Sequence, residues 1–366
     1  MANTRYVPSG ARIKVVGMGG SGCNAITRMV REQLHGVEFI AMNTDAQALE
    51  ITEATVRIQL GPKLTGGLGA GGDNTIGHKA AEESQDAIHD ALVGADMIFL
   101  TAGMGGGTGT GSISVAAEVA KRTGALTIGV VTKPFNFEGT HRAKVAEQGI
   151  QDLMPNVDTL IIIPNDRLLT LCDQKTSIDN AFRLADEVLH HGVQAIAEVI
   201  TVPGLINLDF ADIRAIMKDA GPAWMSIGRG TGQNRAIDAA KDALSSPLLD
   251  VSVTGAKGVL FNIAGSNTLS LYEVNSAAEI IRQAVDPNAN VIFGVVVDPN
   301  MGNDVRLTLI ATGFATKEMM ADASKEKELT KVLKGIHDDE LDLPSFLRRS
   351  GTYNTKSAGI AKKVYN

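Results

Sequence analysis

A glycine-rich run near the end of the first third of the chain constrains the fold most. It reads Thr101-Ala102-Gly103-Met104-Gly105-Gly106-Gly107-Thr108-Gly109-Thr110-Gly111. The run follows an apolar, strand-like segment at residues 97–100 and precedes a helical pattern that begins near Ser112. Without side chains, successive backbone N–H groups can point into one concavity, and such a nest at a helix N-terminus binds anions. No Lys follows in the P-loop arrangement, so the sequence predicts a phosphate site built from the backbone.

Before residue 165, short apolar segments alternate with helical patterns. The expected strands, each ending in Gly, Asn, Asp or Pro, are residues 12–16, 37–42, 55–60, 97–100, 126–132 and 159–163. Helical patterns lie between several of them, for example at 24–34 and 76–92. Strands that alternate with helices predict right-handed βαβ crossovers and a parallel sheet covered by helices on both faces.

The glycines and polar side chains of this half follow the expected strands. They gather at residues 17–24, 43–45, 61–73, 103–111, 133–142 and 165–166. In an open α/β sheet the carboxyl ends of the strands form one crevice, in which ligands bind. We therefore expect a single ligand that is contacted by several loops.

A long helix is expected next, with Ser177 as its N-cap. Apolar residues recur at steps of three and four and predict a buried stripe: Ile178, Phe182, Ala185, Leu189, Val193, Ile196 and Ile200. Pro203-Gly204 ends this pattern. A second α/β unit follows, with strands expected at 224–227, 258–263, 290–297 and 306–312 and a helix at 234–244. From about residue 315 the periodicity is lost, which is typical of a flexible tail.

The composition excludes several classes of protein. Hydrophobic residues make up 44% and charged residues 20% of the 366 residues, as in ordinary globular proteins. The net charge of −7 disfavours a nucleic-acid partner, because proteins that bind a nucleic-acid backbone concentrate Lys and Arg. Cys23 and Cys172 offer no disulfide framework and fit a reducing cytoplasm. His190 and His191 are expected on a helix surface, not as metal ligands.

The first residues lack the apolar segment of an export signal, and no apolar run of about 18 residues occurs. We therefore expect a cytoplasmic protein that does not span a membrane.

A second glycine motif fits the dinucleotide-binding pattern G-x-G-x-x-G. It reads Gly17-Met18-Gly19-Gly20-Ser21-Gly22, and Asp45 lies 23 residues beyond Gly22, near the usual place of the ribose-binding acid. On this motif alone, an NAD(P)-binding Rossmann oxidoreductase is an open alternative, and so is a tight turn that binds nothing. The glycine loops at 103–111 and 66–73 argue against NAD, since several nests at one crevice suit a triphosphate better than a pyrophosphate.

Two carboxylates stand together after the long helix, in Asn207-Leu208-Asp209-Phe210-Ala211-Asp212. At positions i and i+3 of a helix start, they are explained simply by capping and by the helix dipole. The functional interpretation is a pair that holds Mg²⁺ or orients water in phosphoryl transfer. The long helix of about 23 residues spans about 35 Å and should carry them far from the glycine loops. They could then serve only a neighbouring copy's nucleotide, in a head-to-tail stack that forms a filament.

Taken together, these motifs resemble those of FtsZ, the bacterial tubulin-like division GTPases. The resemblance covers about residues 10–316 and a short segment of the tail. Residues 105–111 resemble the tubulin/FtsZ signature, and the further matches are Lys133-Pro134-Phe135-Asn136-Phe137-Glu138-Gly139 with Arg142, Pro164-Asn165-Asp166-Arg167-Leu168, residues 207–212, and Leu341-Asp342-Leu343-Pro344-Ser345-Phe346-Leu347-Arg348-Arg349.

The resemblance implies an α/β, tubulin-like fold. A Rossmann-type parallel-sheet GTPase domain would be joined by a long central helix to a smaller α/β domain, followed by a flexible C-terminal tail. The corresponding ranges are a flexible N-terminus (1–10), a GTP-binding domain (11–177), the central helix (178–202), a C-terminal activation domain (203–316), and a tail (317–366) with an adaptor-binding peptide (338–349).

The resemblance also implies the site residues. Gly20, Ser21, Gly22, Cys23 and Asn24 would bind phosphates together with Gly107, Thr108 and Gly109, with Thr108 near the β- and γ-phosphates. The further nucleotide-binding residues would be Gly69, Ala70, Gly71, Gly103, Met104 and Gly106. Glu138 would bond the ribose hydroxyls, with Arg142 also on the nucleotide; their alternative is a solvated i,i+4 pair. Asn165 and Asp186 would recognise guanine, because a carboxylate can accept hydrogen bonds from its N1–H and N2–H₂ groups. Phe182 would belong to the same site. The alternative for Asp186 is an exposed polar position.

The activity that the resemblance implies is assembly-dependent hydrolysis of GTP to GDP and phosphate. The catalytic residues would be Asn207, Asp209 and Asp212 of the next subunit, with Mg²⁺ held mainly through phosphates and water. Head-to-tail filaments would form the division ring at mid-cell, and residues 341–349 would bind membrane-tethering adaptors. A nucleotide-dependent scaffold without catalysis remains a further alternative, which the intact Asp209/Asp212 pair disfavours. Cys23 stands where Gly or small polar residues are common, so we expect an oxidisable phosphate loop.

Overall fold

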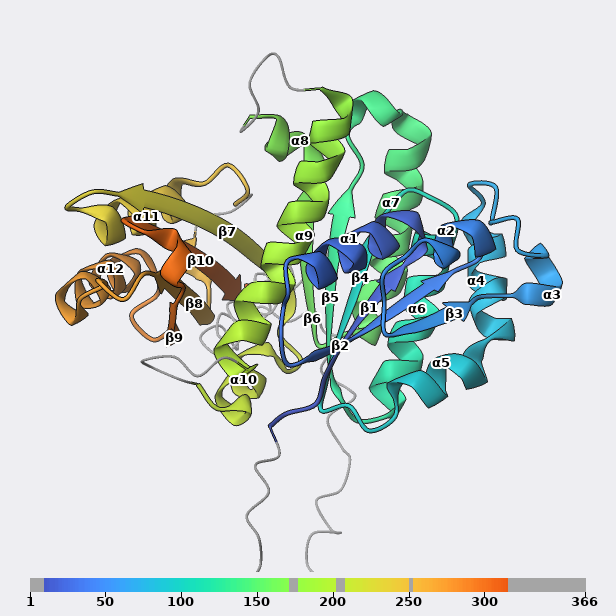
Figure 1. The fold of residues 1–366 in the computed structure, drawn as a ribbon, viewed down its shortest axis with the longest axis horizontal. Coiled ribbons are helices and arrows are strands. Elements are labelled where there is room, and N and C mark those ends of the chain that lie inside the picture. The colour runs from blue at the N-terminus through green and yellow to red at the C-terminus, as the bar shows by residue number, and fades with distance from the viewer. Residues whose placement is uncertain (1–9, 171–176, 202–207, 250–252, 315–366) are drawn as a thin grey trace, which may run out of the picture. The chain divides into compact units, whose positions relative to one another are not determined.

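A ten-stranded sheet runs through the described part of the chain, residues 10–170, 177–201, 208–249 and 253–314 of the computed structural model (Figure 1). Its strand order is β3-β2-β1-β4-β5-β6-β7-β10-β8-β9. The strands are β1 (Ile13–Met18), β2 (Val37–Asn43), β3 (Val56–Gln59), β4 (Met97–Gly103), β5 (Leu126–Lys133), β6 (Thr159–Pro164), β7 (Gly221–Thr231), β8 (Gly258–Gly265), β9 (Asn290–Val297) and β10 (Asp304–Thr312). Within these described ranges, no helix combines the length and apolar composition that crossing a membrane requires.

The first six strands pair in parallel, as the sequence predicts. Both faces of this sheet are buried, because side chains alternate along each strand. In β1, Ile13 and Val15 belong to the core on one face, whereas Val16 and Met18 belong to the core on the other. A parallel sheet that is buried on both faces explains why these strands are almost continuously apolar.

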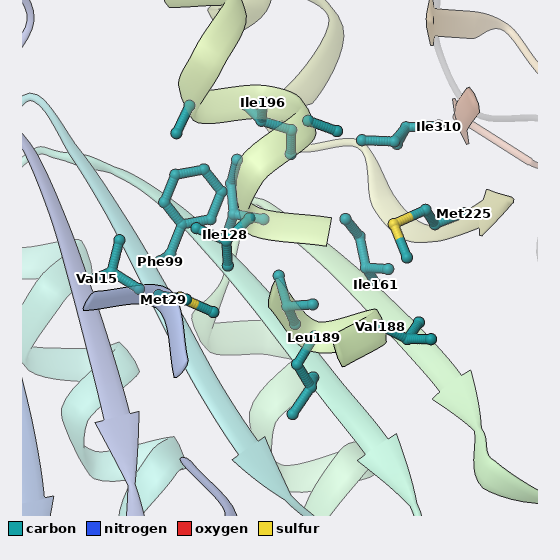
Figure 2. Close-up of a cluster of buried hydrophobic side chains, with 14 of the residues drawn as sticks. Val15, Met29, Phe99, Ile128, Ile161, Val188, Leu189, Ile196, Met225 and Ile310 are labelled. Carbon is teal, nitrogen blue, oxygen red and sulfur yellow. The ribbon is translucent and has the colours of Figure 1, made fainter. Parts of the chain in front are cut away.

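Helices cover the two faces of the parallel sheet. They are α1 (Gly19–Arg31), α2 (Ala46–Glu50), α3 (Pro62–Thr65), α4 (Asn74–Glu83), α5 (Gln85–Leu92), α6 (Thr108–Arg122), α7 (Thr140–Leu153), α8 (Asn165–Leu169) and α9 (Ile178–Thr201). The apolar sides of α1 and α9 pack on one face, and those of α4, α5, α6 and α7 pack on the other. Figure 2 shows Val188, Leu189 and Ile196 of α9 packed against side chains of the strands.

The long helix forms where the sequence predicts it. Ser177 caps α9, since its hydroxyl accepts a hydrogen bond of 3.2 Å from the backbone N–H of Asn180. The stripe is buried at most of its positions, but Phe182 is 40% exposed. The expectation for His190 and His191 is wrong, because both side chains are buried where α9 packs against α1 and the sheet, and each has a ring nitrogen within hydrogen-bond distance of Gln194.

The helical pattern at 76–92 does not form one continuous helix. The structure has two helices there, α4 and α5, which meet at Ser84. The backbone N–H of Gly61 donates to the Ser84 hydroxyl over 2.9 Å, and the Glu83 carboxylate accepts from the N–H groups of Lys63 and Leu64. These contacts with a distant loop divide a pattern that is continuous in the sequence.

The second α/β unit continues the same sheet. Gly221–Ala223 of β7 pairs in parallel with β6, and the rest of β7 pairs antiparallel with β10. Strand β10 pairs antiparallel with β8, and β8 pairs in parallel with β9. The helices of this unit are α10 (Phe210–Met217), α11 (Arg235–Ser245) and α12 (Leu271–Ala284), and α12 was not expected from the sequence. The two units are therefore joined by β7 as well as by α9, and the exact domain boundaries remain a prediction.

Some expectations fall outside the described residues. They concern the N-terminal residues 1–9, Cys172, Pro203-Gly204, Asn207, and the tail with its peptide at 338–349.

Candidate nucleotide site

A cavity of about 280 Å³ opens at the carboxyl ends of the central parallel strands. Loops that follow β1, β4, β5 and β6 meet there, together with the first turns of α9. The residues that line it are Met18, Gly20, Ser21, Gly103, Met104, Gly106, Gly107, Thr108, Gly109, Thr132, Pro134, Glu138, Arg142, Asn165, Phe182, Ala185 and Asp186. The crevice predicted from the strand order is therefore present, and one ligand could contact all of these loops.

Two helices begin at this cavity without a side-chain cap. The first residues of α1 and α6 follow Met18 and Gly107, and neither helix has an acidic residue in its first turn. Their first N–H groups therefore remain available, and both helix dipoles favour an anion in the cavity. Among the described residues, Arg142 is the only cationic side chain in the lining, so most of the donors for an anion are backbone groups.

The two glycine loops touch each other because they lack side chains. Gly19 has a left-handed φ of +68°, and a Cβ at this position would lie 2.6 Å from the backbone nitrogen of Gly109. The first turns of α1 and α6 thereby approach closely enough to share one ligand.

The third glycine loop, residues 66–73, lies behind the loop at 103–111 instead of in the cavity wall. Ala70 is buried, and its Cβ would be 3.0 Å from a Cβ placed at Gly107. Gly69, Ala70 and Gly71 are absent from the cavity lining in the described structure. Through this contact the loop fixes the shape of the phosphate site.

Three expected phosphate-binding residues at the end of the 17–24 segment also lie outside the cavity lining, namely Gly22, Cys23 and Asn24. Gly22 serves close packing, since a Cβ there would lie 2.6 Å from the carbonyl oxygen of Thr101. Cys23 is buried, and desolvation raises the pKa of its thiol to about 11. Because the thiolate is the form that oxidants attack, the expectation of an oxidisable loop is not supported.

Two hydrogen-bond acceptors, Asn165 of α8 and Asp186 of α9, also line the cavity. Asn165 is only 5% exposed, and its Oδ1 has no hydrogen-bond partner within the described residues. Burial raises the pKa of Asp186 to about 7, an effect that the positive charge of Arg28 partly opposes. Buried acceptors without partners are costly, and they fit a ligand edge that presents N–H groups, as guanine does. Asp186 is therefore not the exposed polar position of the alternative interpretation.

Phe182 of the cavity lining belongs to a cluster of aromatic rings, and Glu138 and Arg142 of the lining form an ion pair. Phe135 and Phe137 stack with ring centroids 4.9 Å apart, and Phe182 meets Phe135 edge-on at 5.5 Å. Arg142 donates to Glu138, whose other oxygen accepts from the N–H of Phe135 over 2.9 Å. The i,i+4 ion pair is thus formed, but at a cavity and not on an open helix face.

The carboxylates of Asp209 and Asp212 lie at the other end of the sheet. Asp209 caps α10, since its Oδ1 accepts from the N–H of Asp212 over 2.8 Å, and both side chains are exposed. The hydroxyl of Thr159, the first residue of β6, donates to the carbonyl of Met217 in α10. Asn165 follows the last residue of the same strand. Figure 1 likewise shows α10 beside the C-terminal end of α9, away from α8. The predicted helix start is thus present with Asp209 as its cap, and these carboxylates cannot reach the cavity of their own chain.

Asp45 does not contact the cavity either. Its side chain caps α2 by accepting from the N–H of Ala48 over 3.0 Å. The acidic residue that a dinucleotide site requires at the ribose is therefore used elsewhere.

Comparisons with known proteins agree with this geometry. The Tubulin/FtsZ family, GTPase domain, matches residues 12–173, and the FtsZ family, C-terminal domain, matches residues 221–315. The structure of an FtsZ dimer from M. jannaschii is 46% identical and has a TM-score of 0.81; the match covers 83% of this chain and 89% of that one. The chain belongs to the FtsZ family. CetZ1 from Haloferax volcanii, at 20% identity and a TM-score of 0.72 over 86% of this chain and 99% of that one, shows the same fold.

Membership of the FtsZ family establishes a cytoskeletal GTPase with the expected tubulin-like α/β fold. It also establishes GTP and GDP as the nucleotides. The alternative of an NAD(P)-binding oxidoreductase is wrong, in agreement with the position of Asp45.

Sequence reasoning missed four residues of the cavity lining: Met18, Thr132, Pro134 and Ala185. Each is adjacent to a predicted motif or lies within one. None carries a side chain with a distinctive role toward a nucleotide, so only their position on the loops could have indicated them.

Proposed function

We propose that GTP binds in this cavity with its phosphates at the first turns of α1 and α6. The uncapped helix N-termini support this placement, because their N–H groups have no other side-chain partner. Thr108 contacts the β- and γ-phosphates, and Glu138 and Arg142 contact the ribose side of the nucleotide. Asn165 and Asp186 accept from the guanine edge, and Phe182 covers the base.

We propose further that hydrolysis requires a second copy of the chain. The supporting observation is the separation of Asp209 and Asp212 from the cavity, since β6 alone places about 20 Å between the two ends of the sheet. In a head-to-tail stack, the exposed carboxylates of one copy would close the cavity of the next copy. There, Asp212 and Asp209, together with Asn207, position the water that attacks the γ-phosphate.

Such a stack does not close, so it forms a filament. The names of related structures support assembly, since one is an FtsZ dimer and another is a protofilament of CetZ2 from Haloferax volcanii with GTPγS bound. On the basis of family membership, we propose that the filament forms in the cytoplasm and organises the division ring at mid-cell. Residues 341–349 would bind the adaptors that tether this ring to the membrane.

Mg²⁺ is proposed as the companion of the triphosphate. Of the lining residues that the structure describes, only Glu138 and Asp186 carry a carboxylate, and we place both at the nucleoside. Within the described ranges, no cluster of three or more His, Cys, Asp or Glu side chains could hold a metal. The ion would therefore be held by phosphate oxygens and water, where it would neutralise charge that develops in phosphoryl transfer.

Mixing two inactive variants tests the shared site. Asp212→Asn should bind GTP but hydrolyse it slowly, whereas Asp186→Ala should bind GTP poorly but keep its own Asp212. If one copy completes the site of the next, the mixture should hydrolyse GTP faster than either variant alone. The rate per subunit of the unmodified protein should also rise steeply above a threshold concentration. A mixture no faster than the sum of its parts, with a wild-type rate independent of dilution, would contradict the proposal.

A further inference from the structure

Thr44 lies directly behind the proposed phosphate site. It follows the last residue of β2, and its side chain is completely buried. Its hydroxyl shares a hydrogen bond with the hydroxyl of Thr108, which is the first residue of α6 and lines the cavity. Within the described residues, Thr108 is the only hydrogen-bond partner of the Thr44 hydroxyl.

The direction of this hydrogen bond decides where the proton of Thr108 points. A hydroxyl has one proton to donate and can accept through its lone pairs. If Thr108 donated to Thr44, the Thr44 proton would remain buried without an acceptor, which costs free energy. If Thr44 donates to Thr108, every donor is satisfied once Thr108 finds an acceptor in the cavity. A bound phosphate oxygen is such an acceptor, and an anion strengthens this arrangement.

We infer that Thr44 is a positioning residue for the terminal phosphate of GTP, because it donates to Thr108 Oγ1 and so directs the Thr108 proton into the cavity. The inference rests on the proposed phosphate site. Two hydroxyls that donate in sequence also polarise each other, which makes Thr108 a better donor to a charged oxygen than an isolated threonine.

The backbone of the same segment is tied to the third glycine loop. The carbonyl of Thr44 accepts from the Thr65 hydroxyl over 3.4 Å, and the N–H of Ala46 donates to the carbonyl of Gly67 over 3.0 Å. That loop in turn packs on Gly107 through Ala70. Thr44 therefore lies where the loop after β2, the third glycine loop and the first turn of α6 meet. These contacts hold its hydroxyl in position beside Thr108.

Nucleotide affinities of threonine variants test this role. Thr44→Val keeps the shape of the side chain but removes the donor, whereas Thr44→Ser retains it. With the protein below its assembly threshold, we expect Thr44→Val to lose about 5- to 10-fold in affinity for a non-hydrolysable GTP analogue, the worth of one hydrogen bond. GDP keeps the β-phosphate contact of Thr108 and lacks only the γ-phosphate contact, so its affinity should fall by less than that of the GTP analogue. Thr44→Ser should match the unmodified protein.

Two further variants give the controls. Thr127 is also completely buried, but it lies near the amino end of β5 and donates to the carbonyl of Ala125. Thr127→Val should therefore leave the ratio of GTP-analogue affinity to GDP affinity unchanged, although this variant also loses a buried hydroxyl. Thr108→Val should lower that ratio, and the double variant with Thr44→Val should lose little more, because both act through one donor.

The outcomes separate the inference from the site on which it rests. If Thr108→Val loses preference for the GTP analogue while Thr44→Val keeps it, the role of Thr44 is refuted and the phosphate site stands. If neither variant changes the preference, the placement of the phosphates is wrong as well. Should Thr44→Val unfold, as judged by its melting curve, Thr44→Ala provides the same test with a smaller side chain.

Discussion

The raised pKa of Asp186 predicts that guanine binding depends on pH near neutrality. In the nucleotide-free protein, burial raises this pKa to about 7. Only the ionised carboxylate can accept from both guanine N–H groups, since the protonated form carries a donor of its own. About half of the free protein is therefore competent at pH 7, and about one molecule in ten at pH 6. The association constant of GDP should be level above about pH 8 and fall about tenfold for each pH unit below 7.

The assay is a titration of a fluorescent GDP analogue between pH 5.5 and 8.5, with the protein below its assembly threshold. Phosphate groups also titrate near pH 6, so Asp186→Asn is the matched control, because it shares every other ionisation. The ratio of wild-type to Asp186→Asn affinity isolates the carboxylate and should rise with pH up to about 8. A ratio that stays flat across this range would show that Asp186 does not read the base in its ionised form.

The same substitution should change which base is preferred. Xanthine carries a carbonyl where guanine carries the 2-amino group, and an asparagine amide can donate to that carbonyl. Asp186→Asn should therefore lose affinity for GDP and gain affinity for xanthosine diphosphate in a competition assay. If Asp186 had a purely structural role, the substitution would lower the affinities for GDP and for xanthosine diphosphate equally.

Without nucleotide, the buried carboxylate should also lower the stability of the fold. Because the pKa of Asp186 is higher in the folded chain than its ordinary value of 3.8, the folded state binds more protons between about pH 4 and pH 7. The free energy of unfolding therefore decreases as the pH rises through that window, by about 4 kcal/mol at most. Asp186→Asn should melt at a higher temperature than the nucleotide-free wild type at pH 8, and this difference should shrink toward pH 4.

Three other substitutions probe separate parts of the molecule. Asp212→Asn should keep GTP binding and assembly but slow hydrolysis about 10²- to 10³-fold in a phosphate-release assay; normal turnover in assembled filaments would leave Asp212 only a helix-start role. Gly111→Ala should destabilise the fold by about 3 kcal/mol in urea unfolding, since its Cβ would lie 2.0 Å from the Asn74 carbonyl oxygen, whereas the control Gly255→Ala meets only an ordinary contact. Equal midpoints for the two alanine variants would refute this packing argument. Arg235→Met should cost about 1 kcal/mol, because Arg235 donates to Glu273 over 2.7 Å and, with hydrogen bonds from Ser270, lowers the pKa of that solvent-screened carboxyl to about 2. This stabilisation is present above about pH 4.5 and lost toward pH 2, so a stability difference that stays constant through that window would contradict the assignment.

The sequence by itself determined the parallel sheet and the place of the site. Strands such as β4 and β5 are recognisable because burial on both faces makes them mainly apolar. Loops that follow parallel strands must meet at one edge, so the glycine runs at 17–22 and 103–111 indicated a common phosphate site before any contact was known. The cap of α10 at Asp209 was likewise readable, because capping depends on residues only three positions apart.

Only the tertiary structure decided the features that depend on residues far apart in the chain. The break at Ser84 is made by contacts with residues 61–64, and the burial of His190 and His191 by the elements packed around α9. Helical periodicity shows which side of α9 is apolar, but not that Phe182 faces the cavity. The hydrogen bond between Thr44 and Thr108 joins residues 64 positions apart and follows no local pattern. Local propensity acts over a few residues, whereas desolvation and close packing are set by whichever segments the fold brings together.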